Sequence, residues 1–125
     1  MGESPTNAVG SVVWQDLTVA DAAPSRDFYA AVIGWRFEEG EGDFNMFPAT
    51  GIVPAAGICC ARGPNAKMPP VWMLYLRVAR LDVSVAEAVR RGGSVVDGPR
   101  PAGAGRICVL RDPAGAAVAL YEIDG

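Results

Sequence analysis

The side chains that could do chemistry in this chain are carboxylates, tyrosines, lysines, arginines and three cysteines, because the sequence contains no histidine. The absence of histidine excludes Ser-His-Asp and Cys-His nucleophile pairs, histidine general bases and the commonest neutral metal ligand. Cys59 and Cys60 are adjacent and fall in a strand-like run, where buried and inert thiols are expected. A reaction here would therefore run on carboxylates, tyrosine, lysine, arginine, cysteine or ordered water.

Glu122 is a carboxylate near the chain end that could serve as a metal ligand or an acid. It follows the sequence RDPAGAAVALY, whose Asp112–Gly115 segment suits a type I turn, so a hairpin is expected over Arg106–Ile123. Side chains alternate along a strand, so Ala119 and Tyr121 share one face and Glu122 lies on the other. The pattern therefore predicts that Glu122 points away from any site formed by Ala119 and Tyr121.

The composition predicts one globular domain. The chain has 125 residues, of which 50% are hydrophobic, and its longest apolar run, Val71–Leu76, is far shorter than the ~20 residues of a membrane span. The net charge is −3 and the basic residues are scattered, which argues against nucleic-acid binding. Three cysteines make no disulfide framework, so a reducing, cytoplasmic setting is expected.

An internal repeat at an offset of 59 residues organises the chain. WQDLTVAD, beginning at Trp14, aligns with MLYLRVAR, beginning at Met73. In each half a strand-like run precedes a helical stretch that stops at glycine. Asp21 is predicted to cap the first helix and Asp82 the second. The residues expected on the buried helix faces are Phe28, Tyr29 and Val32 in the first half and Val85, Ala88 and Val89 in the second.

Three further strands are expected after each helix. In the first half they cover 35–38, 44–47 and 56–61, and in the second half 94–96, 106–111 and 116–123. The chain is therefore predicted to be a single α+β domain of two βαβββ modules, at about 9–61 and 71–123. The segment 62–70, rich in proline and glycine, would link them.

Two βαβββ modules in a chain of this size resemble the vicinal oxygen chelate superfamily, which includes glyoxalase I, bleomycin-resistance proteins and extradiol dioxygenases. The resemblance runs from about Val9 to Ile123. It is carried by SVVWQDLTVAD…SRDFYAAVIGW, by the GG that ends the second helix, and by LRDPAGAAVALYE. It implies curved mixed sheets around a cavity, with one helix per module on the outside. The fold does not name the reaction, because some members bind antibiotics without catalysis.

The resemblance also implies where a metal would bind. In metal-dependent members, the first and last strands of each module supply His, Gln and Glu. Carried onto this sequence, those positions fall on Trp14, Met73, Ala119 and either Cys59 or Cys60. Indole, thioether and methyl groups do not hold a hard divalent cation. The family's metal site is therefore expected to be absent, and no cofactor is predicted.

The cavity-facing side chains are predicted from strand alternation and the repeat. They are Trp14, Asp16, Thr18, Met73, Tyr75, Arg77, Ala119 and Tyr121. Aromatic and thioether surface with a few polar groups suits a flat, partly apolar ligand. Two other interpretations stay open: Trp14 and Met73 could fill the sheet interior, and Asp16 and Arg77 could form a structural ion pair.

The sequence thus favours a metal-independent, cytoplasmic binding protein for a small organic molecule, an antibiotic-like compound or an aromatic metabolite, working as a homodimer. The alternative is a metal-independent lyase, isomerase or hydrolase that uses Asp16, Tyr75 or Arg77. A metal-dependent glyoxalase or dioxygenase ranks last. The sequence names neither the ligand nor whether the modules pair within one chain or swap between chains.

Overall fold

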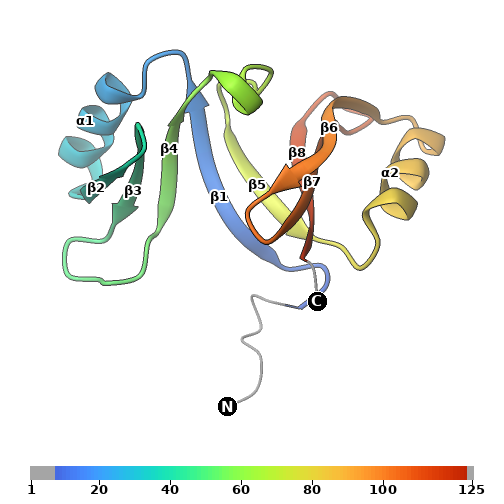
Figure 1. Cartoon of the computed structure of the whole chain (residues 1–125), viewed down its shortest axis with the longest axis horizontal. Helices are drawn as coiled ribbons and strands as arrows, with labels where there is room; N and C mark the ends of the chain where they lie inside the picture. Colours follow the sequence, from blue (N-terminus) through green and yellow to red (C-terminus); the bar gives the residue numbers. More distant parts are fainter. Residues whose placement is uncertain (1–7, 124–125) are drawn as a thin grey trace. The chain divides into compact units, whose positions relative to one another are not determined.

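The computed structural model describes residues 8–123, which divide into two compact units. The first unit is Gln15–Trp72. The second unit is formed by 8–14 together with 73–123. Each unit contains a mixed sheet with a helix on one of its faces (Figure 1). The α+β architecture of two βαβββ modules is therefore confirmed, and the cavity expected between the modules stays a prediction.

The first unit is built around four strands and one helix. They are β1 (Val12–Val19), α1 (Ala22–Ile33), β2 (Arg36–Gly40), β3 (Asp43–Phe47) and β4 (Ala56–Cys60), and the first three residues of β1 belong to the second unit. The strand order is β2-β3-β4-β1, with β1 parallel to β4 and the other pairs antiparallel. A 3₁₀ turn, η2 (Gly63–Asn65), follows in the segment expected to be a link.

Helix α1 begins and ends where the sequence predicts. The Asp21 side chain accepts a hydrogen bond from the backbone N–H of Ala23 at 3.4 Å. Gly34 ends the helix with φ of 84°, a left-handed conformation that glycine adopts without strain, and its N–H donates to the carbonyl of Ala30. The short polar cap and the glycine together fix both ends of the helix.

The core of the first unit lies between α1 and its sheet. Its buried members are Leu17, Ala22, Phe44, Met46 and Ile58, with Tyr29, Trp35 and Trp72 packed against them. Trp72 Nε1 donates to the Tyr29 hydroxyl at 3.1 Å, so the indole N–H of this half-buried tryptophan has a partner. The prediction that Phe28 and Val32 are buried is wrong, because they are 55% and 64% exposed. Only Tyr29 of the expected trio packs on this core.

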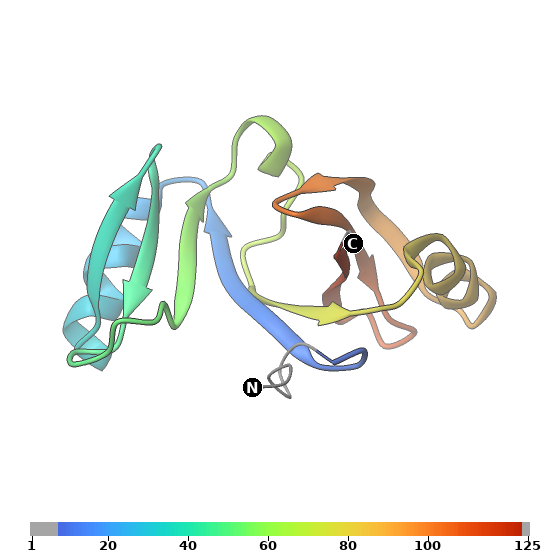
Figure 2. The same ribbon diagram turned by 60° about the horizontal axis from the view of Figure 1, so that its bottom comes forward.

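The second unit repeats the arrangement. Its elements are β5 (Trp72–Arg77, whose first residue belongs to the first unit), α2 (Leu81–Arg90), β6 (Ser94–Ala102), β7 (Gly105–Arg111) and β8 (Ala117–Ile123). The strand order is β5-β8-β7-β6, with β5 parallel to β8 and the rest antiparallel. Figure 2 shows α2 on one side of β6 and β7. Strand β6 runs six residues beyond the expected 94–96.

The start of α2 differs from the prediction. The helix begins at Leu81, so Asp82 lies in its first turn instead of capping it, and Arg80 at the N-cap makes no side-chain cap. The core of this unit contains Leu81, Cys108 and Leu110. Val85 and Ala88 of α2 and Val118 and Leu120 of β8 pack against them. The prediction that Val89 is buried is also wrong, since it is 52% exposed.

The Asp112–Gly115 turn forms as predicted. Asp112 Oδ1 accepts hydrogen bonds from the backbone N–H groups of Ala114, at 2.8 Å, and Ala116, at 3.0 Å. Gly115 takes a φ of 91°, which explains why glycine occupies this position. The turn joins β7 to β8 in register, with Arg111 opposite Ala117. Within residues 8–123, neither α-helix has the length and apolar character needed to cross a membrane.

Candidate functional site

The predicted site residues of the first unit lie on the face of β1 turned away from α1. Leu17 packs in the core beneath the helix, so its neighbours Asp16 and Thr18 lie on the other face. Thr18 is buried at 3% exposure and Asp16 is half-buried. Cys59 of β4 lies opposite Thr18 in the parallel register, which places its thiol on the same face. Trp14, on the same strand, belongs to the second unit and is half-buried.

The predicted residues of the second unit occupy neighbouring positions on two paired strands. Tyr75 of β5 lies opposite Ala119 of β8, and Arg77 lies opposite Tyr121. Val118 and Leu120 pack against α2, so Ala119 and Tyr121 lie on the face turned away from that helix. We call this surface of the β5-β8-β7-β6 sheet the open-side face. The structure therefore brings these predicted residues together on one face.

Burial differs among the residues of the open-side face. Met73 is 1% exposed, Tyr75 8% and Ala119 0%, so these side chains pack as core. Arg77 and Tyr121 are half-buried. The Tyr121 hydroxyl accepts a hydrogen bond from the backbone N–H of Ala104 at 3.2 Å, in the turn between β6 and β7. The interior interpretation therefore suits Met73, Tyr75 and Ala119, whereas Arg77 and Tyr121 are only partly buried.

An ion pair on β6 was missed by the sequence reasoning. Arg100 Nε lies 2.9 Å from Asp97 Oδ2, with 18% and 11% of the two side chains exposed. Asp97 lies opposite Val109 and Arg100 opposite Ile107, both on the open-side face. The two residues are three positions apart in the sequence, and in a regular strand this spacing puts the side chains on opposite faces. The only sequence signal was the Gly98-Pro99 step, since both residues mark irregular strands.

Glu122 points away from the open-side face, as strand alternation predicts. Its Oε1 accepts a hydrogen bond of 2.6 Å from the backbone N–H of Leu81 and one of 3.3 Å from Arg106. The Leu81 N–H, and after it Arg106, hold the pKa of the Glu122 carboxyl below its usual range. Glu122 therefore stabilises the start of α2 and is neither a ligand nor an acid on the open-side face.

The metal site of the superfamily can be tested against the donors present. Met73 and Ala119 offer a thioether and a methyl group at two of the positions. At the third, Cys59 offers a thiol, which is a soft donor. These donors do not fit a divalent cation, and residues 8–123 contain no group of three Cys, Asp or Glu side chains placed to hold one.

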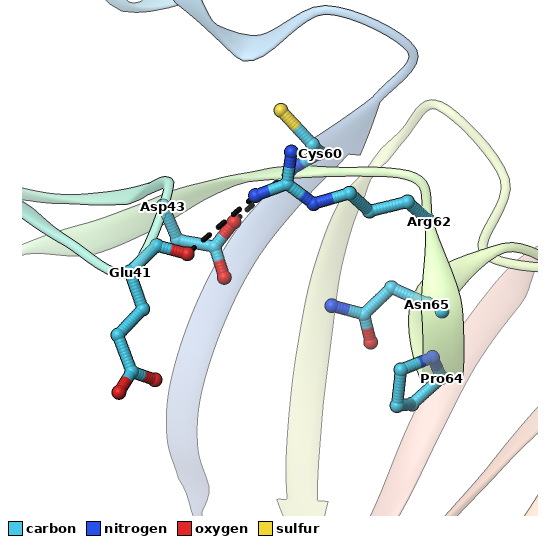
Figure 3. A pocket seen from close by; sticks show the side chains of 7 residues that line it. Glu41, Asp43, Cys60, Arg62, Pro64 and Asn65 are labelled. Atoms are coloured by element: carbon cyan, nitrogen blue, oxygen red, sulfur yellow. Dashed lines mark hydrogen bonds between the residues drawn. The ribbon is translucent and has the colours of Figure 1, made fainter.

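A cavity of about 370 Å³ lies in the first unit, away from the predicted site residues. It is lined by Glu41, Asp43, Cys60, Arg62, Gly63, Pro64 and Asn65. Figure 3 shows the Arg62 guanidinium over the β2–β3 turn, where it donates to the carbonyl oxygen of Glu41 at 3.5 Å. The Asp43 carboxylate accepts from the backbone N–H of Cys60 at 3.2 Å. The connection between β2 and β3 is therefore a tight hairpin turn with the Arg62 guanidinium beside it.

A second cavity, of about 550 Å³, lies beside α2 in the second unit. Its lining is mostly apolar and comprises Val78, Val83, Ser84, Glu87, Ala88, Arg91, Leu110 and Leu120. Glu87 forms ion pairs with Arg90 and Arg91, which keeps the charged groups at its rim paired with one another. None of the eight cavity-facing residues predicted from the sequence lines either of these two cavities, although Cys60, a candidate for one metal-site position, lines the first.

Comparison with known proteins places the chain in a family. The family model described as a glyoxalase-like domain matches residues 12–121. The protein named "Putative glyoxylase CFP32" of Mycobacterium tuberculosis is 33% identical over 119 residues, covering 90% of this chain and 46% of that protein. The "Anthracycline biosynthesis protein DnrV" of Streptomyces peucetius is 32% identical over 134 residues, covering 92% and 48%. The chain thus spans about half the length of these curated relatives.

The fold is also that of a solved glyoxalase. The Mn(II)-bound glyoxalase from Novosphingobium aromaticivorans superposes with a TM-score of 0.58 at 16% identity, covering 91% of this chain and 39% of that one. At this identity the likeness shows the fold alone. The family match covers both βαβββ modules and agrees with the resemblance carried by the sequence motifs. The chain belongs to the glyoxalase-like domain family of the vicinal oxygen chelate superfamily.

Proposed function

We propose that this protein binds a small organic molecule on the open-side face without a catalytic metal. The observation that carries the proposal is that Arg77 and Tyr121, both half-buried, lie opposite each other on the paired strands β5 and β8. The Tyr121 ring provides apolar contact area, and the Arg77 guanidinium supplies a directional polar contact. Together they suit a flat ligand with at least one polar group.

The donor set supports a metal-independent activity. Met73 and Ala119 cannot coordinate a hard cation, and the Cys59 thiol is a soft donor that such a cation does not prefer. We therefore expect extensive dialysis against a chelator to leave ligand binding unchanged. Stoichiometric Ni, Zn, Fe or Mn in the dialysed protein, measured by elemental analysis, would contradict the metal-free proposal.

The names of the relatives support an aromatic, antibiotic-like ligand. DnrV is named as an anthracycline biosynthesis protein, and its similarity covers 92% of this chain. On the proposed function, the protein sequesters such a compound in the cytoplasm and returns it chemically unchanged. The three free thiols in the described part of the chain are consistent with a reducing compartment. A homodimer is proposed from the family resemblance, and sedimentation equilibrium tests it directly.

A catalytic function is the second candidate, and the name "Putative glyoxylase CFP32" favours it. In this case Asp16, Tyr75 or Arg77 would serve a lyase, isomerase or hydrolase reaction. A thermal-shift screen against aromatic metabolites and antibiotics, followed by mass spectrometry of the best hit, separates the two functions. The binding proposal requires that the hit returns with its mass and chromatographic retention unchanged. A product that accumulates with time and needs Tyr75, as shown by Tyr75→Phe, would establish the enzyme instead.

A further inference from the structure

We propose that the cavity beside α2 is a binding site for a small aromatic molecule, whose ring takes the place that the Tyr29 ring fills in the first unit. The cavity lies on the side of the second unit's sheet that α2 covers (Figure 2), opposite the open-side face. The inference therefore goes beyond the proposed function and does not depend on it.

The helices of the two units align at the offset of 59 residues found in the sequence. Helix α1 begins at Ala22 and α2 at Leu81, and both of these first residues are completely buried. The same offset aligns Tyr29 with Ala88, and each of them packs against the core of its own unit. The second unit therefore has a methyl group where the first unit has a phenol ring.

The strands beneath the helices carry a second difference of this kind. Phe44 lies opposite Ile58 in the first unit, and Cys108 lies opposite Leu120 in the second. Ile58 and Leu120 are equivalent, because each also lies opposite the same position of the repeat, which is Leu17 in the first unit and the residue 59 positions later in the second. The second unit therefore has short side chains at two positions where the first unit has aromatic rings.

The cavity lies directly beside Ala88, which is part of its lining. Leu110 and Leu120 line it from the sheet, and Val83, which is 54% exposed, lines it at the surface. Leu81 is larger than the alanine at the equivalent position of α1, but it does not line the cavity, so its extra volume does not fill this space. The volume of about 550 Å³ lies within the range of roughly 300–1,000 Å³ that is usual for small-molecule sites.

The surroundings of Tyr29 indicate which ligand fits. Its ring is half-buried against apolar side chains, and its hydroxyl accepts a hydrogen bond from Trp72 Nε1 at 3.1 Å. The cavity offers similar contacts, since Leu110 and Leu120 provide apolar surface and Ser84 adds a hydroxyl group to the lining. Apolar cavities lined by aliphatic side chains bind small aromatic molecules such as benzene. An aromatic ring that carries a hydroxyl group therefore matches this lining.

The charged side chains on the lining do not require a charged ligand. Glu87 and Arg91 form an ion pair, and Arg90 shares the same carboxylate. The Glu87 and Arg91 side chains are 46% and 70% exposed, so both stay in contact with water. An uncharged ring can therefore enter the cavity without leaving a buried charge unpaired.

The test uses p-cresol, which is the side chain of tyrosine as a free molecule, and the full chain labelled with ¹³C at the methyl groups of Ile, Leu and Val. In NMR titrations, p-cresol should shift the Leu110 and Leu120 methyl signals saturably. Nuclear Overhauser effects from its ring protons to the same methyl groups should locate it in the cavity. Ile107 and Val109 lie on the open-side face, so their methyl signals report binding there separately.

Ala88→Tyr should fill the cavity, because it gives α2 the side chain that α1 carries at the equivalent position. We expect the affinity of the cavity for p-cresol to fall by roughly tenfold or more, which corresponds to about 1.4 kcal/mol. Ala86→Tyr is the matched control, since Ala86 is exposed on the same helix and does not line the cavity. This control variant should bind p-cresol as tightly as the wild type.

The outcomes separate this inference from the proposed function. No saturable shift of the Leu110 and Leu120 methyl signals would overturn the inference, as would equal affinities of the wild type and a folded Ala88→Tyr variant. Shifts confined to Ile107 and Val109 would also overturn it, while leaving the proposed function standing. The wild-type titration locates p-cresol without any variant, so the inference remains testable even where Ala88→Tyr fails to fold.

Discussion

Glu122 caps helix α2 from the last strand of the chain, with its Oε1 2.6 Å from the backbone nitrogen of Leu81. The first backbone N–H groups of a helix have no partner within the helix. Arg80, at the N-cap position, has no short side-chain oxygen that could accept from them. The carboxylate of a residue distant in sequence therefore takes the role that a local Ser, Asp or Asn usually plays, and it ties β8 to α2.

Replacing Glu122 should destabilise the second unit. We expect Glu122→Gln to lower the melting temperature by a few degrees, because the amide accepts from the Leu81 N–H without a charge and loses the ionic contact with Arg106. Asp82 lies in the first turn of α2 and its side chain is 74% exposed, so Asp82→Asn should lower the melting temperature much less. Thermal unfolding followed by circular dichroism measures both variants. Equal losses in melting temperature for the two variants would contradict the role of Glu122 as the cap of α2.

The contribution of Glu122 should also depend on pH. Its pKa is lower in the folded protein, owing first to the Leu81 N–H and then to Arg106, so the folded state favours the charged form. The added stability is therefore fully present above the ordinary glutamate pKa of about 4.3 and is lost as pH falls through the lowered value. The difference in melting temperature between wild type and Glu122→Gln should shrink over that acidic range and stay constant from pH 6 to 8.

The Cys59 thiol should be unreactive at neutral pH. Its pKa is raised to about 12 by burial first, and then by the carboxylates of Asp16 and Asp43. Since the thiolate is the nucleophile, iodoacetamide should label Cys59 slowly at pH 8, and faster only in strongly alkaline solution. Asp16→Asn removes one negative neighbour and should increase the labelling rate at a given pH. Site-resolved mass spectrometry measures it, and rapid labelling of the folded wild type would contradict the assignment.

The core beneath α2 should be sensitive to side-chain truncation. Leu81 is completely buried against Cys108 and Leu110, so Leu81→Ala should cost about 2–5 kcal/mol in the free energy of unfolding. Val83→Ala provides the matched control, because Val83 is on the same helix and is 54% exposed. Its cost should be within about 0.5 kcal/mol. Urea unfolding measures both, and comparable losses would show that the helix packs differently.

Gly105 should tolerate no side chain. A Cβ at this position would overlap the backbone carbonyl oxygen of Glu122 on the paired strand, and neither strand can move without breaking the β7–β8 ladder. Gly105→Ala should therefore cost about 1–3 kcal/mol or more. Gly40→Ala is the control, because an added Cβ there meets nothing within 4 Å. Unfolding that is no easier for Gly105→Ala than for Gly40→Ala would contradict the close approach of β7 and β8.

Local patterns predicted the elements that local chemistry controls. Asp21 and Gly34 bound α1 because a cap and a left-handed glycine act on adjacent backbone groups. The Asp112–Gly115 turn forms for the same reason. Helix faces were predicted less well: Phe28, Val32 and Val89 are exposed, since which apolar residues are buried depends on how much of the helix the sheet covers. Hydrophobic periodicity alone does not contain that information.

The sequence by itself determined the two βαβββ modules, the family and the set of donors. The absence of histidine and the identities of Met73 and Ala119 limit metal chemistry whatever the fold. Only the tertiary structure decided the pairing of Asp97 with Arg100 and the use of Glu122 as a helix cap. The first depends on bulges that reverse strand alternation, and the second on a contact between residues 41 positions apart. Sequence periodicity describes neighbours along the chain, whereas these contacts arise from packing between elements.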